Sequence, residues 1–269
     1  MSRLISLFFT LTLALSISLA TVSESFAQDD EDNIITVAVP NSIFASLRDG
    51  HPAGIIVEGT VAVLAEMGYT MRFLSMSSKD QKRAVYSGDI DVATSMLVSF
   101  QDKPKRSKKA LFTDAVINEY NVIVVRRGEG FKLNKVEDLY GKKIGARIGF
   151  TYPSIQGDDQ VQLERNRKDG ENIRKLMLKE LDAAIVGGVS DLFDFGAEGI
   201  MGQIESLNKA VGYVGLGAAL SNLRFSPEDL AKFNQTLASF KMREEWNVIL
   251  ERNGMRTLVF EWPLIAPKK

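Results

Sequence analysis

Hydrophobic positions in the first half of the chain switch between strand and helix spacing at short intervals. Residues 34–39 form a β-branched run that stops at Pro40, which is typical of a buried strand followed by a loop. Apolar residues between Gly54 and Met67 recur at helical spacing, and Gly68 is the expected stop. The other elements expected in this half are a strand at 71–74, a helix at 80–86 and a strand at 91–97. Such a series predicts parallel strands joined by right-handed crossovers.

The same alternation starts again at Tyr120. The elements expected from there are a strand at 120–125, a short helix at 136–139, a strand at 143–147, a helix beginning at 151–156, a strand at 182–186, an extended run at 211–220, and two helices, of which the first is capped by Ser226. One local unit occurs twice, since Asp91 and Asp182 each stand where a helix end turns directly into a strand. The pattern favours an α/β architecture, and the repeated unit suggests two similar lobes.

The first 27 residues carry the pattern of a secretory signal. Arg3 precedes the apolar stretch Leu4–Ala20, and Ser25-Phe26-Ala27 supplies small residues before an acidic run. We therefore expect cleavage after Ala27 and a periplasmic location. An uncleaved membrane anchor is the alternative, because Leu4–Ala20 is only slightly shorter than a membrane span.

Composition removes several classes of protein. The chain has no cysteine, so neither a disulfide framework nor a lipid-modified cysteine is expected. Its net charge of -1 argues against a nucleic-acid partner. His51 is the one histidine, so the usual ligand sets for transition metals are missing and we expect no metal or other cofactor.

Five local patterns follow one another along residues 33–255. They are Asp49-Gly50-His51-Pro52-Ala53-Gly54 with Glu58, Ser87-Gly88-Asp89-Ile90-Asp91, Arg106 through Phe112-Thr113-Asp114, residues 136–145 with Gly149-Phe150-Thr151-Tyr152, and Leu181-Asp182-Ala183-Ala184. In this order they resemble the periplasmic solute-binding proteins of amino-acid-type ABC transporters, family 3.

The resemblance implies a two-lobed α/β fold of the type II periplasmic binding protein kind. Two crossing strands, expected at 118–126 and 211–220, would join the lobes, with the ligand cleft between them. Lobe 1 would comprise residues 28–124 and 215–269, and lobe 2 residues 125–214.

The resemblance also implies a ligand site. Arg106 would hold a ligand carboxylate with its planar two-donor fork, and the N–H groups after Gly149, with the Thr151 hydroxyl, would complete that site at a helix N-terminus. Ser95 is expected as a polar contact. Aromatic contacts are expected from Phe44, Phe150 and Tyr152. The alternatives are a solvated basic surface around Arg106, an ordinary strand-to-helix turn at Gly149, and buried packing for the aromatic residues.

Position 187 is among the places where the chain departs from the family pattern. Where amino-acid binders usually carry an aspartate for the ligand's α-ammonium group, this chain has Gly187. Asp191 or Glu58 would have to replace that charge, although Glu58 is better interpreted as a cap of its own helix. An α-amino acid is therefore not established as the ligand.

The leading functional hypothesis is a non-enzymatic, monomeric binding protein that delivers a small carboxylate-bearing solute to the membrane permease of an ABC importer. A periplasmic enzyme of the prephenate or arogenate dehydratase type is the alternative, but it needs a general acid, and no carboxylate stands at 149–152 or at Gly187. A ligand sensor that acts through a membrane partner is a further alternative. The tail Thr257–Leu264 is expected to pack on a lobe, with no assigned function.

Overall fold

The computed structural model describes residues 33–259 and 261–266. The predicted signal segment, residues 1–27, lies outside this part of the chain. The elements of the first half are β1 (Ile34–Val39), β2 (Ser46–Arg48), β3 (His51–Ala53), α1 (Ile55–Glu66), β4 (Thr70–Ser75), α2 (Ser78–Ser87), β5 (Val92–Leu97), the 3-10 helix η2 (Val98–Asp102), α3 (Pro104–Ser107), β6 (Ala110–Phe112) and β7 (Ile117–Arg126).

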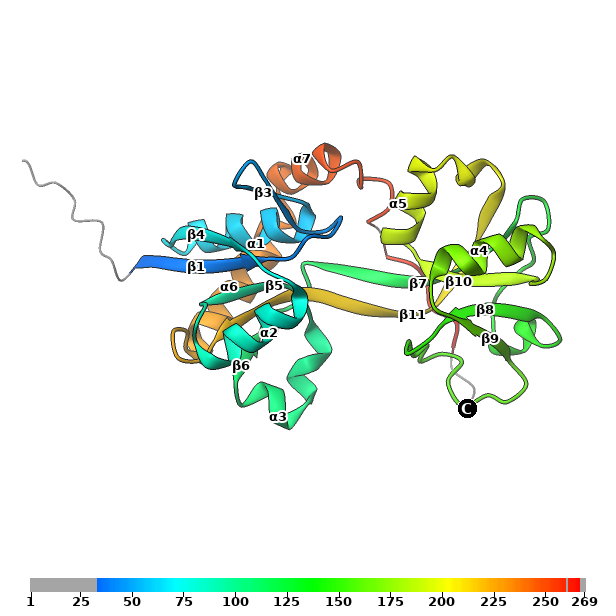
Figure 1. Cartoon of the computed structure of the whole chain (residues 1–269), viewed down its shortest axis with the longest axis horizontal. Coiled ribbons are helices and arrows are strands. Elements are labelled where there is room, and N and C mark those ends of the chain that lie inside the picture. The colour runs from blue at the N-terminus through cyan, green and yellow to red at the C-terminus, as the bar shows by residue number, and fades with distance from the viewer. Residues whose placement is uncertain (1–32, 260, 267–269) are drawn as a thin grey trace, which may run out of the picture. The chain divides into compact units, whose positions relative to one another are not determined.

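The second half begins with the 3-10 helix η3. Its elements are η3 (Val136–Leu139), β8 (Lys143–Arg147), β9 (Gln162–Asn166), α4 (Asp169–Met177), β10 (Ala183–Gly187), α5 (Ser190–Ala197), the 3-10 helix η4 (Ile200–Gly202), β11 (Ile204–Ser221), α6 (Pro227–Phe240) and α7 (Glu244–Arg252). The long strand β11 pairs with β7 in antiparallel register. Figure 1 shows the two strands running together between two groups of elements. The first group contains β1–β6, α1–α3, α6 and α7, and the second contains β8–β10, α4 and α5.

The main sheet has the strand order β4-β1-β5-β11-β7-β10-β8-β9, with β6 on β11. Strand β1 lies parallel to β4 and to β5, as the sequence predicts. Strands β8, β9 and β10 are also parallel, and β10 pairs antiparallel with β7. The mixed α/β architecture is therefore confirmed.

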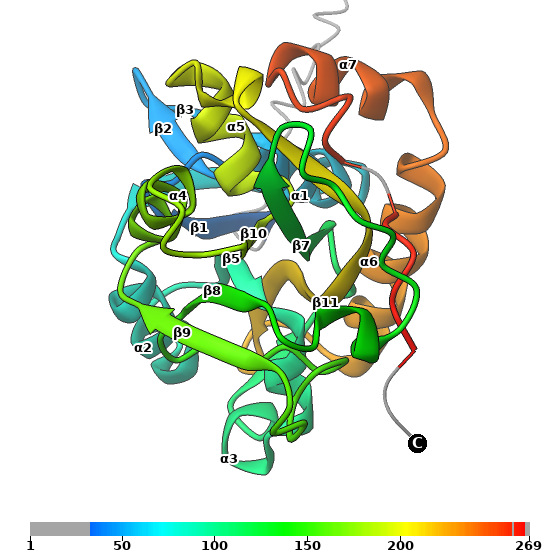
Figure 2. The same cartoon turned by 90° about the vertical axis from the view of Figure 1, so that its right-hand side faces the viewer.

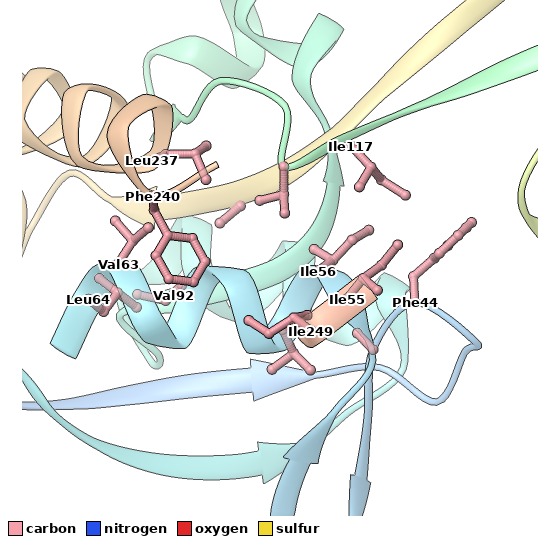
Figure 3. Packing of buried hydrophobic residues seen from close by; sticks show 14 of the residues in the cluster. Phe44, Ile55, Ile56, Val63, Leu64, Val92, Ile117, Leu237, Phe240 and Ile249 are labelled. Atoms are coloured by element: carbon pink, nitrogen blue, oxygen red, sulfur yellow. The ribbon is translucent and has the colours of Figure 1, made fainter. Parts of the chain in front are cut away.

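Separate hydrophobic clusters support each group of elements. One cluster gathers apolar side chains of β1, α1, α6 and α7, and Figure 3 shows part of it, with Ile56, Val63 and Leu64 of α1 among residues of the neighbouring elements. Two further clusters contain Ile123, Ile144, Ile185 and Leu176 around β7, β8, β10 and α4. Burial on both faces explains the continuous apolar runs, since Ile123 and Val125 of β7 lie in one cluster and Val122 and Val124 in the other.

The repeated aspartates perform the same local task in both groups. Asp91 accepts a hydrogen bond from the Thr36 backbone N–H at 2.7 Å, and Asp182 accepts one from the Lys143 N–H at 2.8 Å. In each case the aspartate's own N–H donates back to the carbonyl of the same residue, at 3.1 Å and 2.9 Å. The sequence repeat thus marks two equivalent points where a strand enters the sheet.

The helix predicted at 151–156 does not form, and the segment consists of turns. The Tyr152 hydroxyl accepts a hydrogen bond from the Arg147 N–H at 2.9 Å, and the Ser154 N–H donates to the Val211 carbonyl at 3.1 Å. The bond to Val211 ties Ser154 to β11, and the Ile155 N–H donates to the Tyr152 carbonyl at 3.0 Å, so the backbone closes a turn of the i to i+3 kind. The prediction of a helix N-terminus at this position is wrong.

Several elements escaped the sequence pattern. They are the hairpin β2–β3, strand β9 and helices α4 and α5. The hairpin turn is Asp49-Gly50, and both residues have positive φ, as a two-residue turn of this kind requires. Strand β9 is largely exposed, so it lacks the apolar run by which the other strands were recognised.

The C-terminal segment after α7 returns to the second group of elements. The Ala210 N–H donates to the Pro263 carbonyl at 2.9 Å, and the Ile265 N–H donates to the Ala210 carbonyl at 3.1 Å. Ile265 is buried in the cluster around β8, whereas Leu258 packs on the clusters around α1 and β7. Figure 2 shows this red segment beside the loop that leads to η3, where Ala266 forms a bridge with Lys135.

Candidate ligand-binding site

A pocket of about 410 Å³ lies where β7, β8 and β10 meet the start of α5. Leu97 and Ser99 contribute to it from the end of β5 and from η2, and Val214 and Leu216 contribute from β11. The pocket therefore combines residues from both groups of elements. Its volume is within the range that suits a small solute.

Glu119 lies on β7 and is 7% exposed. Its Oε1 accepts hydrogen bonds from the Ser190 N–H at 3.0 Å and the Ser190 hydroxyl at 2.6 Å, and a longer one from the Val189 N–H at 3.4 Å. These contacts cap the beginning of α5. Burial raises the pKa of Glu119, and the bonds from residues 189 and 190 act in the opposite direction.

Asp191 stands at the second position of α5 and lines the same pocket. Its Oδ2 accepts a hydrogen bond from the Gly187 N–H at 2.5 Å. Burial, reinforced by the nearby Asp169 carboxylate, raises the pKa of Asp191 to about 7. A carboxyl group that titrates near neutrality is thus part of the pocket wall.

Asp169 and Arg147 form an ion pair at the side of the pocket. Their closest atoms, Arg147 Nη1 and Asp169 Oδ2, are 2.9 Å apart, and Asp169 is 7% exposed. Burial raises the pKa of Asp169 although Arg147 works against that shift. The Arg147 guanidinium also lies over the ring of Phe150, 4.8 Å from its centre.

The turn after β8 supplies four of the predicted site residues, Gly149, Phe150, Thr151 and Tyr152, and all four line the pocket. Gly149 has φ 81°, a left-handed conformation that favours glycine. Because no helix begins here, the turn offers individual N–H groups without a helix dipole. Gly187, the other predicted residue on this side, also lines the pocket.

Three predicted site residues lie outside this pocket. The Arg106 guanidinium rests on the Phe100 ring, 3.7 Å from its centre, at the end of the short helix α3. Ser95 lies inside β5 with φ 58°. Phe44 is 9% exposed, and Figure 3 shows it within the hydrophobic cluster beside Ile55. Packing on neighbouring rings and aliphatic side chains accounts for Arg106 and Phe44 in this arrangement.

Of the two acidic residues considered as replacements at Gly187, the structure brings one to the pocket. Asp191 lines it, as described above. Glu58 caps α1, since its Oε1 accepts a hydrogen bond from the Gly54 N–H at 2.9 Å, and it also contacts Arg252. The prediction that Glu58 caps its own helix is confirmed.

Sequence reasoning missed six charged or polar residues of the pocket, which are Ser99, Glu119, Asn121, Arg147, Asp169 and Ser190. For two of them a signal was present: Glu119 and Asn121 stand two positions apart in the first part of β7, directly before its apolar run Val122–Val125. Polar residues with that spacing share one face of a strand. Arg147 and Asp169 are separated by 22 positions, and nothing in the sequence pairs them.

Residues 33–259 and 261–266 contain no group of three or more potential ligands arranged to hold a metal ion. The helices described here are all too short or too polar to cross a bilayer.

The fold and the pocket define the class of two-lobed α/β solute-binding proteins. The family model for bacterial extracellular solute-binding proteins, family 3, matches residues 35–255, and the chain belongs to this family. No curated protein matches the sequence.

Solved structures with the same fold cover most of the chain. The L-cystine solute receptor of Neisseria gonorrhoeae, in its unliganded open conformation, aligns with a TM-score of 0.69 and 17% identity, over 87% of this chain and 98% of that chain. A histidine kinase sensor domain with similarity to periplasmic binding proteins aligns with a TM-score of 0.56 and 22% identity, over 81% and 95%. A mutant of ArgBP from T. maritima aligns with 0.53 and 19%, over 82% and 95%. At these identities the likeness concerns the fold.

Proposed function

We propose that this protein captures a small carboxylate-bearing solute, an amino acid or a related organic acid, in the periplasm and presents it to an ABC importer. One observation carries the proposal: a pocket of about 410 Å³ is lined from both groups of elements and contains charged groups of both signs. A zwitterionic or acidic solute of modest size suits such a pocket. The family match supports solute binding, and the signal pattern at residues 1–27 supports export.

For the carboxylate end of the solute, the pocket offers Arg147 and the N–H groups of the turn at 149–151. Arg106 is the other candidate; it lies on α3, where its guanidinium covers the Phe100 ring. A stacked guanidinium keeps its edge donors available, so Arg106 can serve a ligand without leaving the ring. Movement of the two lobes about β7 and β11 would create the surface that a permease recognises. We propose lobe boundaries at 124/125 and 214/215, within those two strands.

Arg106→Ala and Arg147→Ala test the carboxylate end. We expect Arg106→Ala to weaken binding of an amino-acid ligand at least tenfold, because a charge-assisted hydrogen bond contributes about 1.5–3 kcal/mol. Calorimetry on the purified protein, after a thermal-shift screen of amino acids and organic acids, measures this. Lys105→Ala is the matched control, since Lys105 is the exposed neighbour of Arg106 on α3. Unchanged affinity in Arg106→Ala, with loss in Arg147→Ala, would reject Arg106 and assign the carboxylate to Arg147.

A dehydratase on the same fold is the second candidate function, and one observation favours it. The pocket contains Asp191, whose pKa is raised to about 7, and a general acid needs such a value. The sequence has no carboxylate at 149–152 or at Gly187, but Asp191 lines the same pocket as these residues. Turnover of prephenate by the purified protein, abolished in Asp191→Asn, would favour the enzyme. Binding of a solute without turnover favours the binding protein.

The sensor alternative is separated from import in cells. Loss of uptake of the bound solute in cells that lack this protein supports the importer. Unchanged uptake together with a lost transcriptional response to the solute supports a sensor, the role printed for one structural neighbour, the histidine kinase sensor domain.

A further inference from the structure

We propose that Glu119 of β7 accepts a hydrogen bond from a cationic nitrogen of the solute, while Asn121 donates to an oxygen beside it, so that the ligand is an amine or a guanidine and not a nitrogen-free organic acid. This inference rests on the proposed solute-binding function and narrows its substrate class. It assigns the counter-charge of the ligand cation to a crossing strand.

The positions of Glu119 and Asn121 on β7 bring both side chains to one pocket. Glu119 and Asn121 are two residues apart on β7, so they share one face of the strand, and both line the pocket. They are 7% and 6% exposed, while the neighbouring Val122, Ile123 and Val124 are apolar and fully buried. Two polar side chains in such surroundings need hydrogen-bond partners.

The hydrogen bonds of Glu119 and Asn121 leave one polar atom of each side chain without a partner among the described residues. All the described bonds to Glu119 reach Oε1, which caps α5, and no described group donates to Oε2. The side-chain amide nitrogen of Asn121 likewise has no acceptor among the described residues. Glu119 thus keeps one unpaired carboxylate oxygen, and Asn121 one unpaired donor, both of them buried in the wall of the same pocket. A ligand with an N–H cation and a nearby oxygen satisfies both groups.

The space next to Gly187 is filled by the Glu119 side chain. Gly187 pairs with Asn121 across β10 and β7, and a Cβ at position 187 would collide with Glu119 Oε1 and with the Ser190 hydroxyl. The Glu119 carboxylate therefore occupies the place that a side chain at 187 would need. Glycine at position 187 leaves room for the Glu119 carboxylate. This explains why a glycine stands where the resemblance suggests an aspartate.

The described lining of the pocket contains more carboxylates than cations. Among the described lining residues, Arg147 is the cation, and it is paired with Asp169. Glu119 and Asp191 remain, and they receive hydrogen bonds from neutral groups, namely Ser190 and the Gly187 N–H. Glu119 is buried and Asp191 is half-buried, and Arg147, which also faces Asp191, forms its ion pair with Asp169. The excess of carboxylates over cations in the pocket favours a positively charged ligand group beside Glu119.

Glu119→Gln tests the proposal, because glutamine keeps an oxygen to cap α5 while the charge is removed. The probes are L-lysine, L-arginine and L-glutamate, the amines putrescine and agmatine, and the nitrogen-free acids 2-oxoglutarate and succinate. We expect nitrogen cations alone to bind, with affinities at least tenfold weaker in Glu119→Gln at an unchanged melting temperature of the free protein. Putrescine carries ammonium groups alone and agmatine adds a guanidinium, so tighter binding of agmatine would show that the site prefers a guanidinium. Glu198→Gln is the matched control, since Glu198 is exposed at the end of the same helix.

The results of these binding experiments distinguish a failure of this inference from a failure of the proposed solute-binding function. A nitrogen-free acid that binds as well as an amine, or an amine whose affinity is unchanged in Glu119→Gln, would overturn the inference and leave solute binding intact. No binding of any probe to the wild-type protein would overturn both.

A charge-transfer variant adds a gain of function. Glu119→Ser removes the carboxylate from β7, and the added change Gly187→Asp supplies one from β10 into the space that is released. We expect the double variant to bind the amine at least tenfold more tightly than Glu119→Ser alone. No gain in affinity would contradict the idea that the two positions supply the same charge.

Discussion

Asp191 illustrates how a carboxylate is held in the pocket at the scale of one residue. Four groups from four elements face it: the Gly187 N–H on β10, Glu119 on β7, Asp169 on α4 and Arg147 on β8. Burial and the two carboxylates raise its pKa, while the N–H group and Arg147 lower it. The balance leaves the group near its titration midpoint at neutral pH.

Asp191 should make the stability of the ligand-free protein depend on pH. Its folded pKa of about 7 lies above the ordinary value of 3.8, so the folded state binds more protons than the unfolded state between these values. We expect the free energy of unfolding to fall as pH rises from about 4 to about 7. In Asp191→Asn this slope should be smaller, although Glu119 and Asp169, whose pKa values are also raised, retain part of it.

Melting temperatures across that pH range measure the effect. The control is Asp194→Asn, which removes an exposed carboxylate from the same helix. Equal slopes in the wild type and in Asp191→Asn would show that Asp191 titrates as an ordinary exposed carboxylate.

At the scale of elements, the paired aspartates allow the two halves of the chain to be compared directly. Asp91 and Asp182 make equivalent bonds to the first residues of neighbouring parallel strands. Their surroundings differ, because Asp91 is half-buried and Asp182 is exposed. The same bond therefore competes with water to different extents.

Asp91→Ala should destabilise the protein more than Asp182→Ala. We expect a loss of about 2 kcal/mol for the first, in the range for a hydrogen bond to a charged group, and about 1 kcal/mol or less for the second. Urea denaturation measures both. Asp91→Asn is the control that keeps an oxygen acceptor, and it should recover most of the loss. Equal losses in the two alanine variants would mean that burial does not set the value of this bond.

At the scale of the whole molecule, the C-terminal segment adds a contact that the family match does not include. The match ends at residue 255, and the chain beyond it packs on α1, on β7 and finally beside β8. Its backbone bonds to Ala210 reach β11 close to where that strand pairs with β7. The expected packing of the tail is thus found on both groups of elements.

Ile265→Ala should lower the free energy of unfolding by about 2–4 kcal/mol, as expected for truncation of a fully buried isoleucine. Ile265 is 1% exposed, whereas its neighbour Leu264 is 41% exposed. Leu264→Ala is therefore the matched control, with an expected change within about 0.5 kcal/mol. Urea denaturation of both variants tests this. If Ile265→Ala is as stable as the control, the tail does not contribute to the core.

The sequence alone determined the parts of this protein that depend on local pattern. The apolar runs of β1, β5, β7 and β10, the spacing of α1 and the caps of α6 require burial or local hydrogen bonds, and both leave a periodic signal. The order of motifs was enough to identify the family and the two-lobed fold.

Only the tertiary structure decided the composition of the pocket. Asp169 meets Arg147, and Glu119 meets Gly187 and Ser190, across 22 to 71 positions of chain, and distances of this kind leave no periodic trace. The turn at 151–156 failed as a helix for a related reason, since the Ser154 N–H bonds to the distant Val211 on β11. The carboxylate that faces the ligand site was visible in the sequence as a polar residue in an apolar strand, but its role depends on which strand lies beside it.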